Sequence, residues 1–216
     1  MGKIKDHSPP IIKADSKEGL KNARDVIFSG GLVAFPTESF YGLAVNATNT
    51  KAIWKMYNIK KRPANRPILA LIPSVDQLNQ YVSHIPEIAF SLIDQFWPGG
   101  LTLVLKAGKN ISPALTGNTG KIGIRLSSHP IATALARQVG LPVTGTSANI
   151  SGHSPCMDAM EVFHSLGNQV DLILDGGKTK GGKGSTILDV TVTPPLILRE
   201  GIIDRKELKN FLHRNP

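Results

Sequence analysis

Residues 31–47 read GLVAFPTESFYGLAVNA, a short apolar strand that runs into a cluster of polar side chains. Leu32 to Phe35 follow two glycines and form a continuous apolar run, which is typical of a buried strand. Pro36 to Gly42 then place hydroxyl groups, a carboxylate and a phenol within seven residues. In an α/β protein, ligands bind where the strands end in loops. The stretch therefore predicts a buried strand with a binding site at its end.

Helices and strands alternate along the first two-thirds of the chain, whereas the last third is mostly strand. Periodicity, capping residues and terminal glycines predict a short helix at the end of the chain and helices over 15–29, 50–60, 74–82, 86–96 and 130–139. Apolar runs predict strands over 32–35, 68–72, 101–106, 121–126, 141–144, 170–177, 185–191 and 195–201. This order indicates one α/β domain around a mixed sheet. The polar loops after 35, after 144 and over 176–185 are the candidate positions of a site.

Composition narrows the class of protein. The 216 residues are 41% hydrophobic and carry a formal charge of +9, which fits either an anionic partner or an ordinary basic surface. Cys156 is the single cysteine, so no intramolecular disulfide can form and nothing indicates an oxidising compartment. No signal-peptide segment begins the sequence, and no run approaches the roughly 20 apolar residues of a membrane helix. We expect a soluble cytoplasmic protein with no membrane partner.

The sequence matches none of three familiar motifs: the P-loop, the nucleophile elbow of hydrolases and a zinc site. The loop GKTKGGKGS, at 177–185, resembles a phosphate-binding P-loop, but Gly184 stands where that motif needs Ser or Thr, and a strand follows instead of a helix. The segment GTSAN, at 145–149, resembles the nucleophile elbow of hydrolases, but Asn149 replaces the second glycine. One cysteine and six scattered histidines give no zinc-site spacing. The sequence thus predicts a site with neither an enzyme nucleophile nor a dedicated metal.

Cationic residues stand out at three places. KKRPANR, at 60–66, contains four cations at a helix end, where the alternative to a binding role is a solvated terminus stabilised by the helix dipole. Arg125 lies inside the strand IGIRL, where a buried charge needs a carboxylate or phosphate from the protein or from a ligand. Arg199, in LILREG, raises the same question. Ser147 and Asn149 either offer hydrogen bonds at a strand end or form an ordinary turn.

Together these motifs resemble those of the threonylcarbamoyl-AMP synthase, or YrdC-like, family in its short single-domain form. In order along the chain they are PTESFYGL (36–43), KKRP (60–63), FWPGGLTLVL (96–105), IGIRL with HP (122–130), TSANISG (146–152), STILDVT (185–191) and LREG (198–201). The resemblance implies an α/β fold with a twisted open mixed parallel and antiparallel sheet, flanked by helices, around a basic concave cleft. It also predicts three parts of the chain: a lead-in over 1–14, a catalytic domain over 15–203 and a helical tail over 204–216.

The resemblance further implies a reaction. Members of the family condense L-threonine, bicarbonate and ATP into threonylcarbamoyl-AMP and release pyrophosphate, the first step of threonylcarbamoyl-adenosine modification of tRNA. The carbamate of threonine attacks the α-phosphate directly, so the protein needs only to align the reactants and neutralise charge. Magnesium is expected to arrive with ATP rather than in a protein site. Downstream partners are expected to be tRNA or tRNA-modification proteins.

Position by position, the resemblance also assigns roles to residues of this chain. Those expected to bind threonine are Thr37, Arg125 and Ser185, with Arg125 at its carboxylate. Those expected to bind ATP are Lys60, Arg62, Ser147, Asn149 and Arg199. Lys60 and Arg62 form the K-x-R pair that handles the phosphates, and they are the expected catalytic residues.

One departure from the family keeps two alternatives open. Many relatives have a histidine in the strand after the K-x-R pair, where this chain has Leu69 and Leu71, which cannot replace its hydrogen bond. The first alternative is an RNA- or tRNA-binding paralogue without synthase activity, although only 6% of the residues are aromatic and no RNA-binding motif is recognised. The second is an enzyme that forms a related carbamoyl-adenylate from another substrate.

Overall fold

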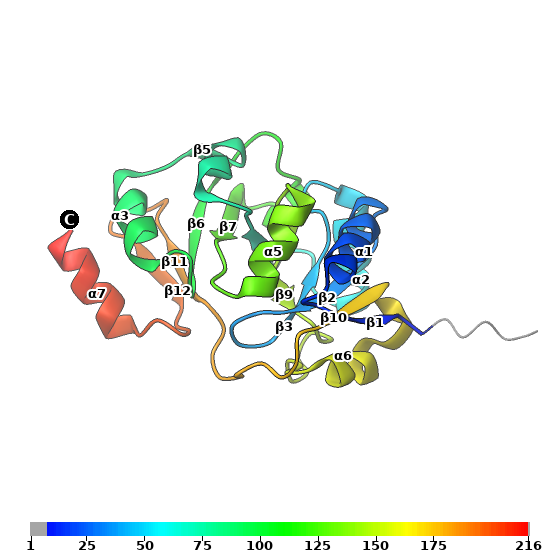
Figure 1. The fold of residues 1–216 in the computed structure, drawn as a ribbon. Coiled ribbons are helices and arrows are strands. Elements are labelled where there is room, and N and C mark those ends of the chain that lie inside the picture. The colour runs from blue at the N-terminus through cyan, green and yellow to red at the C-terminus, as the bar shows by residue number, and fades with distance from the viewer. Residues whose placement is uncertain (1–7, 216) are drawn as a thin grey trace, which may run out of the picture.

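A mixed sheet at one side of the molecule contains the strand that follows the first helix (Figure 1). The computed structural model describes residues 8–215. In this first sheet the strand order is β1-β10-β2-β3-β9. The strands are β1 (Ile11–Lys13), β10 (Leu172–Asp175), β2 (Val33–Pro36), β3 (Tyr41–Ala44) and β9 (Thr146–Ser147). The pairs β1/β10 and β10/β2 are parallel, and β2/β3 and β3/β9 are antiparallel.

A second mixed sheet has the order β12-β11-β6-β7-β4-β8, with β5 paired to β6. Its strands are β12 (Leu196–Arg199), β11 (Thr186–Asp189), β6 (Leu101–Ala107), β7 (Lys121–Arg125), β4 (Ala70–Leu71), β8 (Val143–Thr144) and β5 (Val82–His84). The pairs β11/β6 and β4/β7 are parallel, and the other pairs are antiparallel. Arg125 thus ends β7 near the middle of this sheet, and Arg199 ends its edge strand.

Helices surround the two sheets (Figure 1). They are α1 (Lys17–Phe28), α2 (Thr50–Lys60), α3 (Glu87–Phe96), α4 (Pro113–Thr116), α5 (Pro130–Val139), α6 (Ala159–Leu166) and α7 (Arg205–Arg214), with short 3₁₀ helices η1 (Val75–Gln80) and η2 (Gly167–Gln169). Ser16 and Asn49 begin α1 and α2, since each side chain accepts a hydrogen bond from the backbone N–H three residues later. Gly140, with φ of 70°, ends α5.

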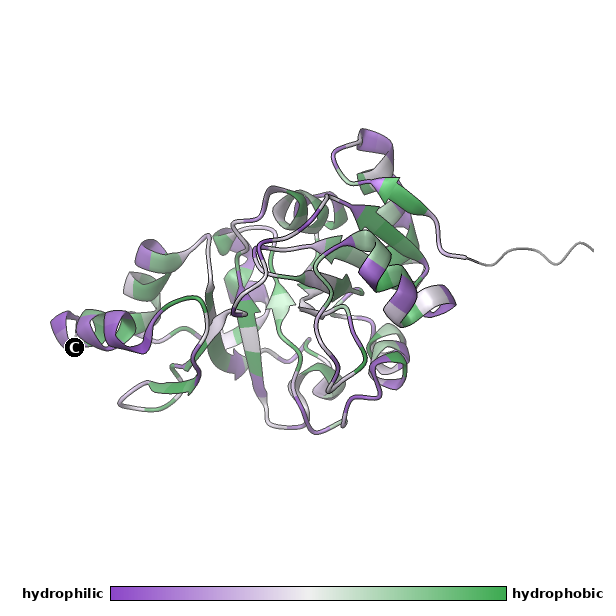
Figure 2. Ribbon diagram, turned by 90° about the horizontal axis from the view of Figure 1, so that it is seen from below, coloured by the Kyte–Doolittle hydropathy of each residue, from purple (hydrophilic) through white to green (hydrophobic). Residues whose placement is uncertain are grey.

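The strand β2 is buried on both faces. Val33 and Phe35 pack with residues of α1 and α5, whereas Leu32 and Ala34 belong to the larger apolar cluster on the opposite face. All four residues have an exposure of 0%, which explains why the sequence shows a continuous apolar run instead of an alternating one. Figure 2 shows apolar residues along the strands and polar ones on the outward turns of the helices.

The predicted α/β class with mixed strands and flanking helices is confirmed, but the strands divide between two sheets instead of one. Helices were correctly predicted near 17–28, 50–60, 87–96 and 130–139. The segment predicted as a helix over 74–82 is instead η1 followed by β5, and Tyr81 N–H bonds to Leu78 O, three residues back. Within residues 8–215, no helix is both long and apolar enough to cross a bilayer.

Several elements were not predicted because their sequence signals are weak. β3 is four residues long, contains a glycine and pairs with the preceding strand β2 and with β9. β9 is two residues long and depends on pairing with the distant β3. The short α4 and the helix α6 were also missed. Residues 11–13, part of the predicted lead-in, form β1 and pair with β10. Residues 1–7 of that lead-in lie outside the described residues, as does residue 216 of the predicted tail.

Thr144 and Gly145 connect the two sheets. Thr144 Oγ1 accepts a hydrogen bond from Val45 N (3.0 Å) and donates one to Leu43 O (2.9 Å). Gly145 then carries the chain directly from β8 in one sheet into β9 in the other. A Cβ atom at Gly145 would lie 2.6 Å from Leu69 Cδ1, so glycine permits the crossing chain to pass this close to the end of β4. The polar segment after β8 is thereby brought between the sheets.

We predict that Thr144→Val destabilises the protein by about 1–3 kcal/mol, because a nearly isosteric side chain leaves the buried Val45 N–H without its acceptor. Urea unfolding monitored by circular dichroism measures the change. Thr48→Val is the matched control, since Thr48 is exposed and its substitution is expected to change stability by less than about 0.5 kcal/mol. Equal effects of the two substitutions would contradict the role assigned to Thr144.

Candidate functional site

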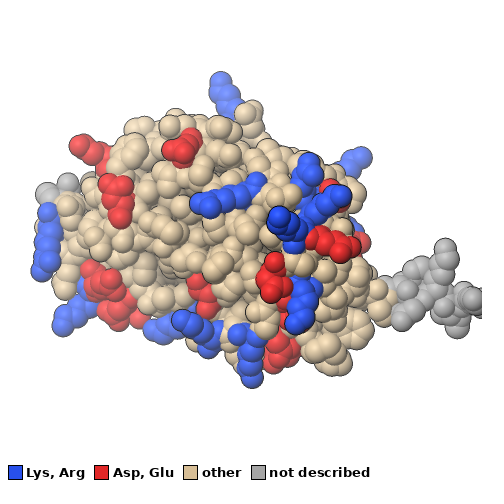
Figure 3. All heavy atoms as spheres, in the orientation of Figure 1, with Lys and Arg blue, Asp and Glu red and all other residues tan. Residues whose placement is uncertain are grey.

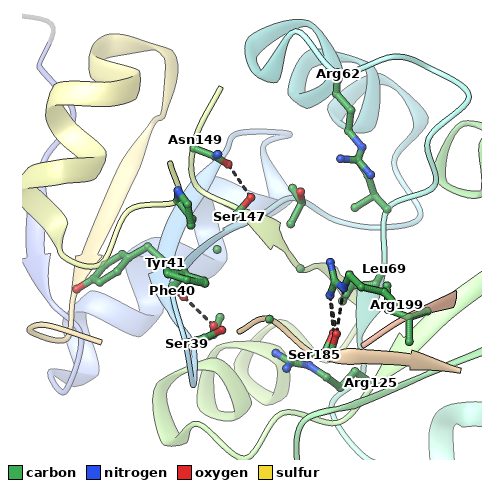
Figure 4. Close-up of a pocket in the computed structure, with 18 of the residues that line it drawn as sticks. Ser39, Phe40, Tyr41, Arg62, Leu69, Arg125, Ser147, Asn149, Ser185 and Arg199 are labelled. Atoms are coloured by element: carbon green, nitrogen blue, oxygen red, sulfur yellow. Dashed lines mark hydrogen bonds between the residues drawn. The ribbon is translucent and has the colours of Figure 1, made fainter. Parts of the chain in front are cut away.

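A pocket of about 410 Å³ lies between the two sheets, next to the crossing at Gly145 (Figure 4). Residues from both sheets and from the loops between them line it: Thr37, Ser39, Phe40, Tyr41, Gly42, Arg62, Pro67, Ile68, Leu69, Arg125, Gly145, Thr146, Ser147, Asn149, His153, Pro155, Gly184, Ser185, Ile187 and Arg199. The volume is within the range of small-molecule sites in proteins. Every predicted site residue except Lys60 is among these residues.

Arginines dominate the charge of the pocket. Arg62 follows α2, Arg125 ends β7, and Arg199 ends β12. Desolvation lowers the pKa of all three, and the charges of Arg125 and Arg62 lower the pKa of Arg199 further. Among residues 8–215, only Arg125 of the three forms an ion pair. The pocket differs in this from the face in Figure 3, where cations and anions are interspersed.

Arg125 is paired with Glu38, a residue from the turn between β2 and β3. Its Nη2 lies 3.0 Å from Glu38 Oε2, and the side chains are 7% and 15% exposed. Arg125 Nε is buried and has no hydrogen-bond partner in the described part of the chain. Glu38 therefore supplies the carboxylate that a buried arginine needs, but leaves part of the guanidinium unsatisfied. Sequence reasoning placed Glu38 in the polar cluster but did not identify this pairing.

Glu38 also connects the pocket to the N-terminus of α5. Its Oε1 accepts hydrogen bonds from Ser127 Oγ (2.7 Å), Ser128 N (2.6 Å) and His129 N (3.3 Å). Burial raises the pKa of Glu38, but Arg125 and the hydrogen bonds from Ser127 and Ser128 outweigh it and hold that pKa below its ordinary value. Two backbone N–H groups at the start of a helix are thus satisfied by an acidic side chain from another element.

Ser185 lies beside Arg199 and deep in the pocket wall. Its Oγ accepts hydrogen bonds from Thr102 Oγ1 (2.8 Å) and from Arg199 Nη2 (3.1 Å). Arg199 also donates from Nη2 to the carbonyl oxygen of Ser185 (2.7 Å). Arg199 can only donate to this hydroxyl, whereas Thr102 and Ser185 can each donate or accept in the bond between them, so Ser185 can turn its proton to a ligand. Arg199 and Ser185 act as one unit, with β12 holding the guanidinium against β11.

Ser147 and Asn149 lie on the opposite side of the pocket from Ser185 (Figure 4). Ser147 Oγ donates to Asn149 Oδ1 (2.6 Å), and Asn149 Nδ2 donates to His153 O (2.6 Å). The partner of the serine hydroxyl is thus an amide oxygen, which cannot remove its proton as the histidine of a hydrolase does. This geometry agrees with the prediction that Ser147 is not a nucleophile.

Lys60 differs from the other predicted residues because it lies beneath the pocket. The residue is 1% exposed and its ammonium donates to the carbonyl oxygens of Ser147 and Asn149 and to Asn149 Oδ1. Burial, and then the charge of Arg62, lower the pKa of Lys60 to about 7. Arg62, by contrast, does line the pocket. Its Nη2 donates to Pro67 O (2.8 Å), so the K-x-R pair divides between two environments.

The loop over 176–185 closes one side of the pocket. Tyr41 OH donates to Gly177 O (2.8 Å) and accepts from Gly176 N (3.1 Å), and burial raises the pKa of Tyr41 to about 12. Gly184 and Ser185 line the pocket, but the three lysines of this loop do not. Lys183 instead lies 3.3 Å from Glu200 on the surface. The loop does not wrap a helix N-terminus, as a P-loop would.

Thr37 and Leu69 contribute the remaining predicted features. Thr37 Oγ1 donates to Phe40 O (2.7 Å) and closes the turn between β2 and β3. Leu69 lines the pocket, whereas Leu71 is 1% exposed and belongs to the core. Of these two leucines, Leu69 is therefore the one that contributes apolar surface to the pocket. Residues 8–215 contain no group of three His, Cys, Asp or Glu side chains that could hold a metal ion.

The other lining residues differ in how far the sequence predicts them. Ser39, Tyr41 and Gly42 fall inside the polar cluster that was expected to form a site. His153 and Pro155 were not predicted, because only the folding back of the chain after Asn149 brings them to the pocket. No local sequence pattern predicts such a contact.

Comparisons with known proteins agree with the fold. The sequence model of the Sua5/YciO/YrdC family, described as "Telomere recombination", matches residues 25–201. A threonylcarbamoyl-AMP synthase of Bacillus subtilis is 40% identical over 88% of this chain and 55% of its own length, so the chain spans about half of that relative.

Solved structures extend the comparison. The Sua5 protein of Pyrococcus abyssi, complexed with L-threonine, superposes with a TM-score of 0.89 at 35% identity, over 94% of this chain and 60% of that one. YciO of Escherichia coli superposes with a TM-score of 0.81 at 29% identity, over 92% of this chain and 96% of that one. With its motifs, its fold and this match over most of its length, the chain belongs to the Sua5/YciO/YrdC family.

Proposed function

We propose that this protein condenses L-threonine, bicarbonate and ATP into threonylcarbamoyl-AMP and releases pyrophosphate. The observation that carries the proposal is the pocket itself, in which three arginines converge but, among residues 8–215, only the carboxylate of Glu38 pairs with one of them. Such an excess of positive charge favours a ligand with several anionic groups. The family relationship, and a relative whose structure contains L-threonine, support threonine and a nucleotide as that ligand set.

We propose that threonine binds on the side of Arg125 and Ser185. Arg125 retains an unpaired Nε, and its guanidinium can bind a carboxylate in addition to Glu38. Ser185 can donate its proton while it accepts from Arg199 and Thr102, and the Thr37 hydroxyl, which already donates to Phe40 O, can still accept a hydrogen bond. Leu69 adds an apolar surface in the same pocket, against which a methyl group of the substrate can pack.

ATP is proposed to bind on the side of Arg62, Ser147 and Asn149, with Arg199 between the two substrates. Together with Arg125, these residues are proposed to make up the predicted basic concave cleft. Magnesium is proposed to enter as part of the ATP substrate, because divalent ions bridge phosphate oxygens in most nucleotide reactions. The catalytic domain is proposed to be the segment 15–203, which contains all of the proposed contacts.

The proposed reaction proceeds without a covalent enzyme intermediate. Bicarbonate takes up a proton and loses water to give carbon dioxide, and the amine of threonine adds to the carbon dioxide and loses a proton, which gives a carbamate. A carbamate oxygen then forms a bond to the α-phosphorus of ATP as the bond to the β-phosphate oxygen breaks, and pyrophosphate leaves. Arg62 and Arg199 are positioned to stabilise the charge on the phosphates. The labile product is proposed to serve tRNA modification through a downstream enzyme.

Pyrophosphate release tests the proposal directly. Purified protein is incubated with ATP, bicarbonate and magnesium, with and without threonine, and with valine as a matched amino acid that lacks the hydroxyl. Release that depends on threonine, together with a product of the mass of threonylcarbamoyl-AMP, is the expected result. Release that is independent of the amino acid indicates another carbamoyl-adenylate activity. No release, combined with binding of tRNA, indicates an RNA-binding paralogue; either result would refute the proposal.

We predict that Arg125→Lys raises the KM for threonine about tenfold or more and changes the KM for ATP much less. The reason is that a lysine keeps the charge facing Glu38 but loses the planar fork, and a charged hydrogen bond is worth about 1.5–3 kcal/mol. Steady-state kinetics with each substrate varied in turn make the measurement. A thermal melt confirms that the variant is folded. Equal increases in both KM values would assign Arg125 a structural role instead.

We predict that Ser147→Ala lowers activity only moderately, by the roughly 0.5–1.5 kcal/mol of one neutral hydrogen bond. The serine hydroxyl donates to an amide oxygen, and no histidine or carboxylate of residues 8–215 is hydrogen-bonded to it. Intact-mass spectrometry during turnover provides the second measurement, since no adduct is expected on the protein. A loss of activity by many orders of magnitude, or a trapped adduct on Ser147, would revive the covalent mechanism.

A further inference from the structure

The environment of Lys60 differs from the one expected of a lysine that binds phosphate directly. Its side chain is almost fully buried, at 1% exposure, and it is not among the residues that line the pocket. The three donors of an ammonium group meet three oxygen atoms: Ser147 O, Asn149 O (2.7 Å) and Asn149 Oδ1 (3.2 Å). No donor of Lys60 is therefore left for a ligand in the pocket.

The contacts of Lys60 determine the shape of the segment 147–151. The ammonium binds the backbone on both sides of Ala148, and the carbonyl oxygen of Lys60 accepts from Ser151 N (2.8 Å). Side chain and backbone of one residue therefore hold both ends of the segment. The C-terminus of α2 is also a favourable place for a cation, because helix carbonyl groups point toward it.

Lys60 also sets the orientation of the Asn149 amide. An ammonium only donates, so it requires that Oδ1, and not Nδ2, faces it. Oδ1 is then available to accept from Ser147 Oγ (2.6 Å), and Nδ2 donates to His153 O (2.6 Å). If Lys60 is removed, the amide loses one of the two contacts that distinguish its ends, and only the bond from Nδ2 to His153 O remains. The hydroxyl of Ser147, which does line the pocket, depends on that orientation.

We propose that Lys60 is a positioning residue for nucleotide binding, which acts through Ser147 and Asn149 instead of touching the phosphates. This inference rests on the proposed function for the identity of the nucleotide, but not for the geometry. Among residues 8–215 no carboxylate lies within ion-pair distance of Lys60, so its charge also remains uncompensated by the protein. Lys60 thus orders the loop from beneath the pocket.

The first test compares Lys60→Met with Lys55→Met in the ligand-free protein. Lys55 is on the same helix, but it is 45% exposed and pairs with Asp171 at the surface, where such pairs contribute little. Amide hydrogen exchange followed by mass spectrometry is expected to accelerate over 147–153 in Lys60→Met and to remain unchanged elsewhere. Lys55→Met is expected to leave that segment unaffected. Unchanged exchange over 147–153 in Lys60→Met would overturn the proposal.

The second test is a double-mutant cycle on the Kd for ATP, measured by calorimetry without threonine. Lys60→Met alone is expected to weaken ATP binding about tenfold, and by clearly less when Ser147→Ala is already present, because the two residues act in one path. The same factor in both backgrounds would mean that Lys60 contacts the phosphates itself, and would refute the inference. Neither measurement involves threonine or pyrophosphate, so failure of the proposed reaction is seen separately.

A measurement on the unsubstituted protein decides the question if Lys60→Met does not fold. The ¹⁵N-labelled ammonium of Lys60 is expected to show hydrogen-bond couplings to the carbonyl carbons of Ser147 and Asn149. These couplings are expected to persist when ATP is added. Their loss on addition of ATP would show that the ammonium turns to the nucleotide, and would overturn the proposal.

Discussion

The crossing of the chain from one sheet to the other at Gly145 is the constraint on which the site depends. The two sheets have their own strand orders and share no strand, so a ligand site between them requires a segment that belongs to both. Residues 143–147 meet this need, with β8 in the second sheet and β9 in the first. The approach is possible because Gly145 has no side chain to collide with Leu69, and because Thr144 satisfies the backbone of the neighbouring strand. As a result, Arg125 and Ser185 face Ser147 and Asn149 across one pocket.

Electrostatics then determine what the pocket can hold. Three arginines line it, a buried lysine lies beneath it, and Glu38 is the carboxylate that pairs with Arg125. Glu38 also accepts hydrogen bonds from the backbone at the start of α5, so one acidic residue connects the end of β7 to the start of α5. Lys60 and Arg125 are buried, and buried cations are costly unless anions pair with them. A nucleotide and an amino-acid carboxylate provide such anions, which is why the geometry and the family relationship lead to the same proposed reaction.

The hydrogen bonds of the pocket suit alignment of reactants more than covalent catalysis. Ser147 donates to the amide oxygen of Asn149, and Ser185 accepts from the side chains of Thr102 and Arg199. Thr37 closes the turn between β2 and β3. Each hydroxyl is oriented by the protein before any ligand enters. Lys60 extends this arrangement one layer below the surface of the pocket, since its three hydrogen bonds fix the loop that presents Ser147. Preorganised dipoles and charges of this kind stabilise a phosphoryl-transfer transition state without a bond to the enzyme.

The sequence by itself determined the α/β class, most of the helices, the buried strand after Gly31 and the chemical types present at the site. These properties follow from local periodicity, capping residues and the presence of charged or hydroxyl side chains at strand ends. Only the tertiary structure decided that the strands form two sheets, that β3 and β9 exist, and that Glu38 is the partner of Arg125. It also separated Lys60 from Arg62, although the two are neighbours in one motif. The physical reason is that pairing partners and burial depend on residues some 80 to 90 positions away in the chain, and a local pattern contains no information about contacts at that distance.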